Sequence, residues 1–200
     1  MFERLFGSRG ADPALAGRVP PGQYLTEKFP VLHYGSVPKV DLATWDFRVY
    51  GEVDSPFRLT WSEFQALPRT TLTTDIHCVT RWSKLDTHWE GVAIRTILGM
   101  AQVRSSATHV VGHAEQGYTA NLPLGVLDDT DVILADTFDG APLEPEHGYP
   151  LRLIVPKRYF WKGAKWLRGL EFLTHDSPGF WERYGYHNDA DPWTEERFAE

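Results

Sequence analysis

The feature that most constrains the fold of this chain is a set of short segments in which apolar residues alternate with others. In the first of them Trp45, Phe47 and Val49 take every second position, and the segment ends at Gly51. An apolar period of two predicts a strand with one buried face. Comparable segments predict strands over residues 70–76, 108–111, 131–135, 151–155 and 166–173, with a turn at 138–140.

Helices are expected to be few and short. The capping-box spacing of Thr60 and Glu63 predicts one short helix. Another is expected over residues 92–100, and a last one over residues 191–198, where Asp-Pro offers an N-cap and a first-turn proline. Because strands dominate, the predicted fold class is α+β.

The length of 200 residues fits one domain. Residues 1–30 are rich in Gly, Pro and small residues and are expected to form an extended arm, with residues 31–200 as a single domain. No apolar run reaches the about 18–20 residues that a membrane-spanning helix needs. The first ten residues lack the pattern of a secretory signal, which predicts a cytoplasmic location.

The overall composition limits the class of protein. Hydrophobic residues make up 42% of the chain, which excludes a wholly disordered protein. The 20 basic and 27 acidic residues give a net charge of −7, which argues against a general nucleic-acid binder.

The chain has one cysteine, Cys78, at the predicted end of a strand. A single cysteine excludes an internal disulfide and any site that needs several protein thiolates. His77, Arg81 and Lys84 are close in sequence, and cations favour the thiolate, the form that binds metals or attacks substrates. The alternative is a buried thiol that packs as a small hydrophobic side chain.

A stretch of one charge sign lies between His147 and Leu170, where no Asp or Glu occurs. With the backbone N–H groups around Gly163, its cations could bind a phosphate or another compact anion, and its aromatic residues could pack on a flat ring system. The alternative is a solvated basic face. The cations are Arg152, Lys157, Arg158, Lys162, Lys165 and Arg168, and the aromatic residues are Tyr159, Phe160, Trp161 and Trp166.

Eight histidines leave a zinc site conceivable, since His, Cys and carboxylates are zinc ligands. His109 and His113 are four residues apart, but strand residues at this spacing point the same way by periodicity alone. Neither His-Glu-x-x-His nor a paired-Cys spacing is present. A zinc-dependent hydrolase is therefore kept as the lesser alternative.

Several short motifs follow one another in a fixed order. They are Cys78–Ser83, Trp89–Val92, Asp139–Leu143, His147–Pro156, Tyr159 and Lys162–Trp166, with a tail at Ser177–His187 and Asp191–Trp193. Together they resemble the sulfite oxidase superfamily of molybdopterin-binding oxidoreductases. The likeness is greater to its short bacterial members and to the methionine sulfoxide reductase branch than to true sulfite oxidases, and it extends from about Trp45 to Leu173.

This resemblance implies a sulfite oxidase-type fold of mixed β-sheets with short helices, and a molybdopterin cofactor. It implies that Cys78 is the protein ligand to molybdenum, a role that suits a soft thiolate. It also implies that Arg152, Lys165 and the backbone of the adjacent loop hold the phosphate end. The cofactor contacts that it assigns are His33, Tyr34, Cys78, His113, His147, Arg152, Gly163, Ala164 and Lys165.

The implied activity is a two-electron transfer of an oxygen atom on a small S- or N-containing substrate. Arg81, Trp82 and Tyr118 are the expected catalytic pocket residues, Arg81 suiting an anionic substrate and the aromatic groups a neutral thioether oxide. The run after Cys78 departs from the Ala-Gly-Asn-Arg-Arg-like run of true sulfite oxidases, which argues against sulfite. With no Cys-x-x-Cys-His haem site in the chain, a separate electron donor or acceptor is expected. The alternative is a cofactor-free binding or assembly module with the same fold.

Overall fold

The computed structural model describes residue 15 and residues 17–199. The first half of the arm predicted over residues 1–30 lies outside the described residues.

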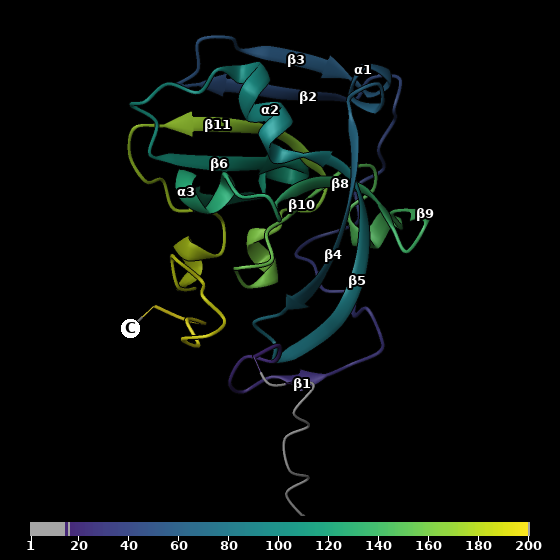
Figure 1. Cartoon of the computed structure of the whole chain (residues 1–200), viewed down its shortest axis with the longest axis vertical. Coiled ribbons are helices and arrows are strands. Elements are labelled where there is room, and N and C mark those ends of the chain that lie inside the picture. The colour runs from purple at the N-terminus through teal and green to yellow at the C-terminus, as the bar shows by residue number, and fades with distance from the viewer. Residues whose placement is uncertain (1–14, 16, 200) are drawn as a thin grey trace, which may run out of the picture.

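Strands dominate the structure and form two sheets (Figure 1). The first sheet has the order β1-β5-β8-β10, with β4 paired to β5 and β9 paired to β8. Strand β1 runs parallel to β5, and the other pairs are antiparallel. Its strands are β1 (Tyr24–Leu25), β4 (Arg69–His77), β5 (Trp82–Ala93), β8 (Ile133–Phe138), β9 (Ala141–Pro142) and β10 (Arg152–Ile154).

The second sheet has five strands in the order β3-β2-β11-β6-β7. Strand β11 runs parallel to β2, while the remaining pairs are antiparallel. Both sheets are therefore mixed, as expected. Its strands are β2 (Asp46–Gly51), β3 (Phe57–Thr60), β6 (His109–Ala114), β7 (Thr119–Pro123) and β11 (Leu167–Leu173).

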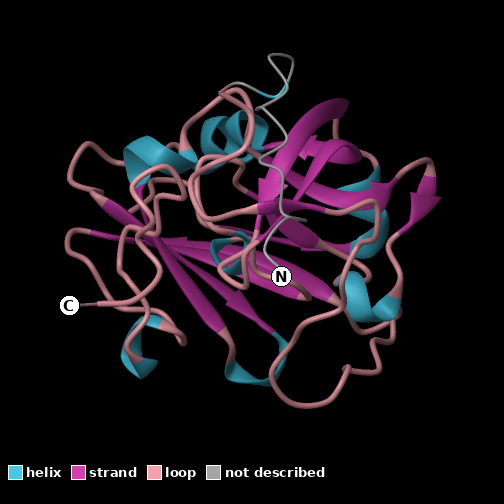
Figure 2. Cartoon of the chain, turned by 90° about the horizontal axis from the view of Figure 1, so that it is seen from below, coloured by secondary structure: helices cyan, strands magenta, loops and turns pink. Residues whose placement is uncertain are grey.

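Helices form a smaller part of the described structure than strands (Figure 2), and the longest of them, α2, has eight residues. Helix α1 begins at the predicted capping box, since the Thr60 hydroxyl accepts from the Glu63 N–H and the Glu63 carboxylate accepts from the Thr60 N–H. None of the helices in the described part of the chain is long and apolar enough to cross a bilayer. The helices are α1 (Trp61–Gln65), α2 (Ile94–Ala101) and α3 (Leu124–Leu127), with 3-10 turns η2 (Glu115–Gly117), η3 (Pro145–His147), η4 (Phe160–Lys162) and η5 (Glu182–Tyr184).

The main core lies between the two sheets. Phe47 of β2 and Leu170 of β11 belong to one fully buried cluster with Leu134 of β8 and Leu153 of β10, so side chains from both sheets meet there. This packing is the main source of stability, because burial of a large apolar side chain contributes about 1.5–3 kcal/mol. It also fixes β10, whereas the end of β4 at Ile76 packs with Cys78 in a second buried cluster.

The structure differs from the sequence predictions in one predicted helix and in one long strand that was not predicted. The predicted helix over residues 191–198 is wrong: the Asp191 carboxylate accepts from the Trp193 N–H in a turn, and Glu195 adopts a left-handed backbone with φ of 55°, which a helix does not tolerate. The twelve-residue strand β5 was not expected either. Its charged residues mask the alternation in which Thr87, Trp89 and Gly91 are buried.

Candidate functional site

A cavity of about 350 Å³ brings together residues from distant parts of the sequence. It is bounded by the described part of the arm, the turn after β4, the start of β10, the loop after η4 and the C-terminal segment. Aromatic side chains supply most of its wall. The lining includes Cys78, Arg152, Gly163 and Lys165, with Phe29, His33, Tyr34, Trp82, Tyr118, Phe160, Trp161, Trp166, Phe180, Trp181 and Tyr186.

Cys78 enters the cavity from the tight turn that joins β4 to β5. The Cys78 N–H donates to the Trp82 carbonyl (2.9 Å), and the Arg81 N–H donates to the Cys78 carbonyl (3.0 Å). Only 8% of the residue is exposed, and the Thr80 hydroxyl donates to Sγ at 3.2 Å. Burial raises the pKa of the Cys78 thiol, and the Thr80 hydrogen bonds and the charges of Lys165 and Arg197 oppose that shift.

The cations that act on Cys78 are not its sequence neighbours. The His77 ring bonds to Ser83 (2.8 Å), and burial lowers the pKa of His77 to about 4, so it is neutral at pH 7. Arg81 is exposed and does not line the cavity. Lys84 donates to the Glu27 carbonyl at 2.9 Å. The charges that favour the thiolate therefore come from Lys165 and Arg197, which are distant in sequence, and burial outweighs them, so the pKa of Cys78 is raised.

Both chain ends hold the turn that carries Cys78. From the arm, the Gln23 side-chain amide donates to the Cys78 carbonyl at 3.1 Å. From the C-terminal segment, Arg197 Nη1 donates to the Val79 carbonyl at 2.6 Å, and its guanidinium lies 4.8 Å from the centroid of the Tyr159 ring. The turn is thus fixed by contacts that the sequence around it does not reveal.

Arg152 is a fully buried cation that lines the same cavity as Cys78. Its Nη1 and Nη2 donate to the carbonyls of His147 (2.8 Å) and Gly163 (3.3 Å), and its Nε has no partner. Burial lowers the pKa of Arg152 to about 9, which still leaves it charged at neutral pH. A buried charge without a counter-ion costs several kcal/mol of desolvation, so this position favours an anion from outside the chain.

Lys165 is the second cation of the cavity. Its Nζ donates to the carbonyls of Leu32 (2.9 Å) and Glu146 (2.6 Å), which ties the segment after the arm and the turn η3 to the loop after η4. Burial and the nearby charge of Arg152 lower the pKa of Lys165 to about 7. An anion bound here would raise that pKa again, because it favours the ammonium form.

The other four cations of the basic stretch are paired inside the chain. Lys157 and Arg158 pair with Asp129 and Asp189, Lys162 pairs with Glu182, and Arg168 pairs with Asp46 and Glu115. The stretch is therefore neither one anion site nor one solvated face. Only Arg152 and Lys165 line the cavity.

The backbone near these cations differs from the expected phosphate loop. Gly163 lines the cavity, and a Cβ on it would lie 2.6 Å from the Leu153 carbonyl oxygen, so the loop approaches β10 as only glycine allows. However, the Gly163 N–H donates to Phe160 and the Ala164 N–H donates to Lys162. Ala164 itself is packed in the main core. In this conformation neither N–H is free for an anion.

The predicted histidines have different surroundings. His33 lines the cavity together with Tyr34. His147 lies just behind the lining, where its ring stacks on Phe29 with centroids 3.9 Å apart. His113 is on the outer face of the second sheet, where it bonds to Glu171 (2.8 Å) beside Tyr50, so the geometry does not support a cofactor contact there. No three His, Cys, Asp or Glu side chains are grouped as metal ligands in the described residues.

Of the expected pocket residues, Trp82 and Tyr118 line the cavity. The Tyr118 hydroxyl donates to the Trp161 carbonyl at 2.6 Å, and burial raises the pKa of Tyr118. Sequence reasoning did not select Phe29, Trp181 and Tyr186, which also line it. The signal available for Trp181 and Tyr186 was the density of aromatic residues in the tail motif at Ser177–His187.

Comparison with known proteins defines the class to which this fold and cavity belong. The chain belongs to the oxidoreductase molybdopterin-binding domain family, whose sequence model matches residues 34–181. It is 50% identical to the "uncharacterized oxidoreductase YuiH" of Bacillus subtilis, over 92% of this chain and 93% of that protein. It is 28% identical to a protein-methionine-sulfoxide reductase catalytic subunit of Gluconobacter oxydans, over 74% of this chain and 54% of that protein.

A solved structure confirms the fold. The sulfane dehydrogenase SoxCD from Paracoccus pantotrophus superposes with a TM-score of 0.66 at 22% identity, over 76% of this chain and 43% of that chain. The expected fold and the expected oxidoreductase class are thus both confirmed.

Proposed function

We propose that this chain binds a molybdopterin in the cavity and performs a two-electron transfer of an oxygen atom on a small S- or N-containing substrate. The observation that carries the proposal is the presence of the buried, unpaired cation Arg152 in the same cavity as the single cysteine. A thiolate ligand and two cations in one cavity fit a metal joined to an organic group with an anionic terminus.

The residues of the cavity fit the parts of such a cofactor. Cys78 Sγ would bind molybdenum, supported by the Thr80 hydroxyl. Arg152 and Lys165 would hold the anionic terminus, and Phe160 and Trp166 give flat surfaces for the pterin rings. The chemistry that a bound molybdopterin supplies is the exchange of an oxygen atom together with two electrons.

The chain itself contributes orientation and exclusion of water. The Gln23 and Arg197 hydrogen bonds fix the turn that presents Sγ. The aromatic wall limits water at the reacting end, which strengthens the electrostatic interactions inside. Since Arg81 does not line the cavity, the pocket favours a neutral S- or N-oxide over a small anion.

The relatives support an S- or N-containing substrate and a separate redox partner. Relatives of this chain include enzymes named for methionine sulfoxide reduction and, in barley, for nitrate reduction (30% identity over 76% of this chain and 20% of that protein). A relative from Azospira oryzae is named as a putative subunit of a protein-methionine-sulfoxide reductase. A subunit works with another chain, which agrees with a separate electron donor or acceptor here.

The test uses protein purified from a host that makes molybdopterin. We expect molybdenum and pterin in equimolar amounts with the chain, measured by elemental analysis and by fluorescence of the oxidised pterin. Cys78→Ser should lose turnover of a model sulfoxide while the circular dichroism spectrum stays unchanged. Protein that contains neither molybdenum nor pterin would favour the cofactor-free module instead, and full activity of Cys78→Ser would remove Cys78 from the site.

A further inference from the structure

The C-terminal segment supplies one wall of the cavity. We define the C-terminal wall as Phe180, Trp181 and Tyr186, which line the cavity together with Cys78. Val79, the residue after Cys78, packs in one apolar cluster with Trp181 and Tyr186. The wall and the turn that presents the thiol therefore pack against the same buried cluster of Tyr159, Trp161 and Ala190, so movement of the wall would change the surroundings of Sγ.

A buried ion pair lies immediately behind this wall. Lys162 at the end of η4 and Glu182 at the start of η5 have side chains that are 0% and 2% exposed, and their charged atoms are 2.6 Å apart. Lys162 Nζ also donates to the backbone and side-chain oxygens of Asn121, each at 2.9 Å. All three ammonium protons thus have acceptors, which fixes Lys162 in one position.

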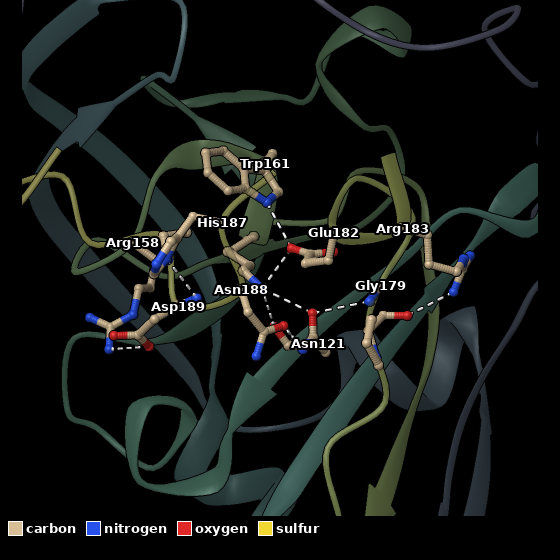
Figure 3. Close-up of polar contacts among 12 residues, drawn as sticks. Asn121, Arg158, Trp161, Gly179, Glu182, Arg183, His187, Asn188 and Asp189 are labelled. Carbon is tan, nitrogen blue, oxygen red and sulfur yellow. Dashed lines mark hydrogen bonds and ion pairs between the residues drawn. The ribbon is translucent and has the colours of Figure 1, made fainter. Parts of the chain in front are cut away.

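The pair is connected to the wall through Trp161. The Trp161 indole N–H donates to Glu182 Oε1 at 2.9 Å (Figure 3). The same oxygen accepts from Lys162. The Trp161 ring lines the cavity and meets the Tyr186 ring edge-on, with centroids 5.1 Å apart. Glu182 Oε1 therefore orients the Trp161 side chain, which lines the cavity. It also anchors the segment that carries the C-terminal wall.

Asn121 on β7 extends the same network along the segment. Its Oδ1 accepts from the Gly179 N–H (3.1 Å), and its Nδ2 donates to Asn188 (2.8 Å) (Figure 3). The same Nδ2 also donates to Asp176 (2.7 Å). Gly179 allows this close approach, because a Cβ there would lie 2.5 Å from Glu182 Oε2 and 2.8 Å from the Thr119 carbonyl oxygen. The segment is tied to the sheet by polar contacts on both sides of the wall.

We propose that Lys162 and Glu182 are positioning residues that hold the C-terminal wall against Val79 and thereby fix the shape of the pocket that receives the substrate. The proposal rests on the proposed function, which places the substrate in this cavity. The pair suits this role because desolvation offsets most of the stabilisation from a buried ion pair, whereas its hydrogen bonds demand one geometry. Neither residue needs to touch the substrate.

The test uses the single cysteine as a reporter. In Glu182→Gln the Lys162 ammonium stays buried without its counter-charge, so the wall should detach more often. We expect iodoacetamide to alkylate Cys78 in cofactor-free protein at least about tenfold faster than in the wild type. In loaded protein, KM for methyl p-tolyl sulfoxide, with a reduced viologen as electron donor, should rise by a larger factor than kcat falls.

The matched control is Glu171→Gln. Glu171 is partly exposed and pairs with His113 on the outer face of the second sheet, away from the cavity lining. In Glu171→Gln, the rate at which Cys78 is alkylated and the KM for the sulfoxide should equal those of the wild type. If Glu182→Gln does not fold, the double variant Lys162→Met/Glu182→Met leaves no unpaired charge and should still alkylate faster, because the tie to Trp161 is gone.

Two results separate the inference from the proposed function. Alkylation of Cys78 at the wild-type rate in every folded variant, with an unchanged KM, overturns the positioning role even when the wild type holds molybdenum. Wild-type protein without molybdenum overturns the proposed function, yet the alkylation assay on the same protein still decides whether the pair holds the wall.

Discussion

The guanidinium of Arg152 lies 4.1 Å from the centroid of the Phe160 ring, and no carboxylate in residues 17–199 pairs with it. A cation–π contact contributes about 0.5–2 kcal/mol, which is less than the several kcal/mol that desolvation of a charge costs. The chain thus keeps a cation where its own fold gains little from it. The anionic terminus of the proposed cofactor would supply the compensating charge.

This relationship predicts that Arg152 serves the ligand more than the fold. In Arg152→Met we expect the pterin content of purified protein to fall several-fold. The free energy of unfolding of the cofactor-free protein should change by less than about 1 kcal/mol, because removal of a buried charge offsets the loss of its hydrogen bonds to the His147 and Gly163 carbonyls. Pterin fluorescence and urea denaturation measure the two effects.

Arg168→Met is the contrasting variant. Arg168 pairs with the buried carboxylate of Asp46 and with Glu115. Burial would raise the pKa of Asp46, but the hydrogen bonds from Arg168 and Arg48 lower it to about 2, so the carboxylate stays charged. Loss of Arg168 should therefore lower the free energy of unfolding by at least about 2 kcal/mol, with little loss of pterin. Equal losses of stability in Arg152→Met and Arg168→Met would contradict the view that Arg152 serves the ligand and Arg168 serves the fold.

The pKa of Lys165 predicts how anion binding depends on pH. Burial lowers this pKa to about 7, so the ammonium form prevails at pH 6 and the neutral amine at pH 8.5. Because only the ammonium attracts an anion, the affinity of cofactor-free protein for sulfate should fall as pH rises, by up to about tenfold per unit above 7. Sulfate keeps its charge over this range, and calorimetry gives the affinity.

Lys165→Arg supplies the control for this titration. A guanidinium stays protonated at both pH values, so the variant should bind sulfate with nearly the same affinity at each. A wild-type affinity that does not change between pH 6 and pH 8.5 would mean that Lys165 is not part of the anion site.

The close approach of the loop at Gly163 predicts a steric cost. In Gly163→Ala the new methyl group would meet the Leu153 carbonyl oxygen at 2.6 Å, so the loop must move away from β10. We expect a loss of about 1–3 kcal/mol in the free energy of unfolding, measured by urea denaturation, and a loss of pterin. Gly99→Ala in α2 meets no atom within 4 Å and should be neutral or stabilising.

The contact of Arg197 with the Val79 carbonyl predicts a local change in mobility. Removal of this charged donor in Arg197→Gln should speed amide hydrogen exchange over residues 78–81 by roughly tenfold, while exchange in the core strands stays unchanged. Arg104→Gln, which breaks an exposed pair with Asp54, should leave exchange in this turn as in the wild type. Mass spectrometry of peptic fragments resolves the two regions.

Sequence reasoning succeeded where the signal is local. Alternation at Trp45, Phe47 and Val49 identified β2, and the capping box at Thr60 identified α1. It failed at β5, because charged and small residues obscure the burial of Thr87, Trp89 and Gly91, which is imposed by neighbouring strands. Strand pairing of this kind is tertiary information.

The same limit applies to the site. The motif order placed Cys78, Arg152 and Lys165 in one cavity, and the structure brings all three together. The sequence could not show that the other four cations of the basic stretch pair with distant carboxylates, or that His113 faces away. Both outcomes depend on which elements pack against each other, and no local sequence pattern determines that packing.

The contacts of Gln23 and Arg197 with the turn at Cys78 have a practical consequence for handling this protein. Chain termini are commonly treated as neutral sites for affinity tags, fusions or trimming. Here removal of Gln23 or Arg197 would break a hydrogen bond to the Cys78 or the Val79 carbonyl, in the turn that carries the thiol. Comparisons between preparations should therefore keep both residues, and a form shortened past either one is best regarded as a variant of the candidate site.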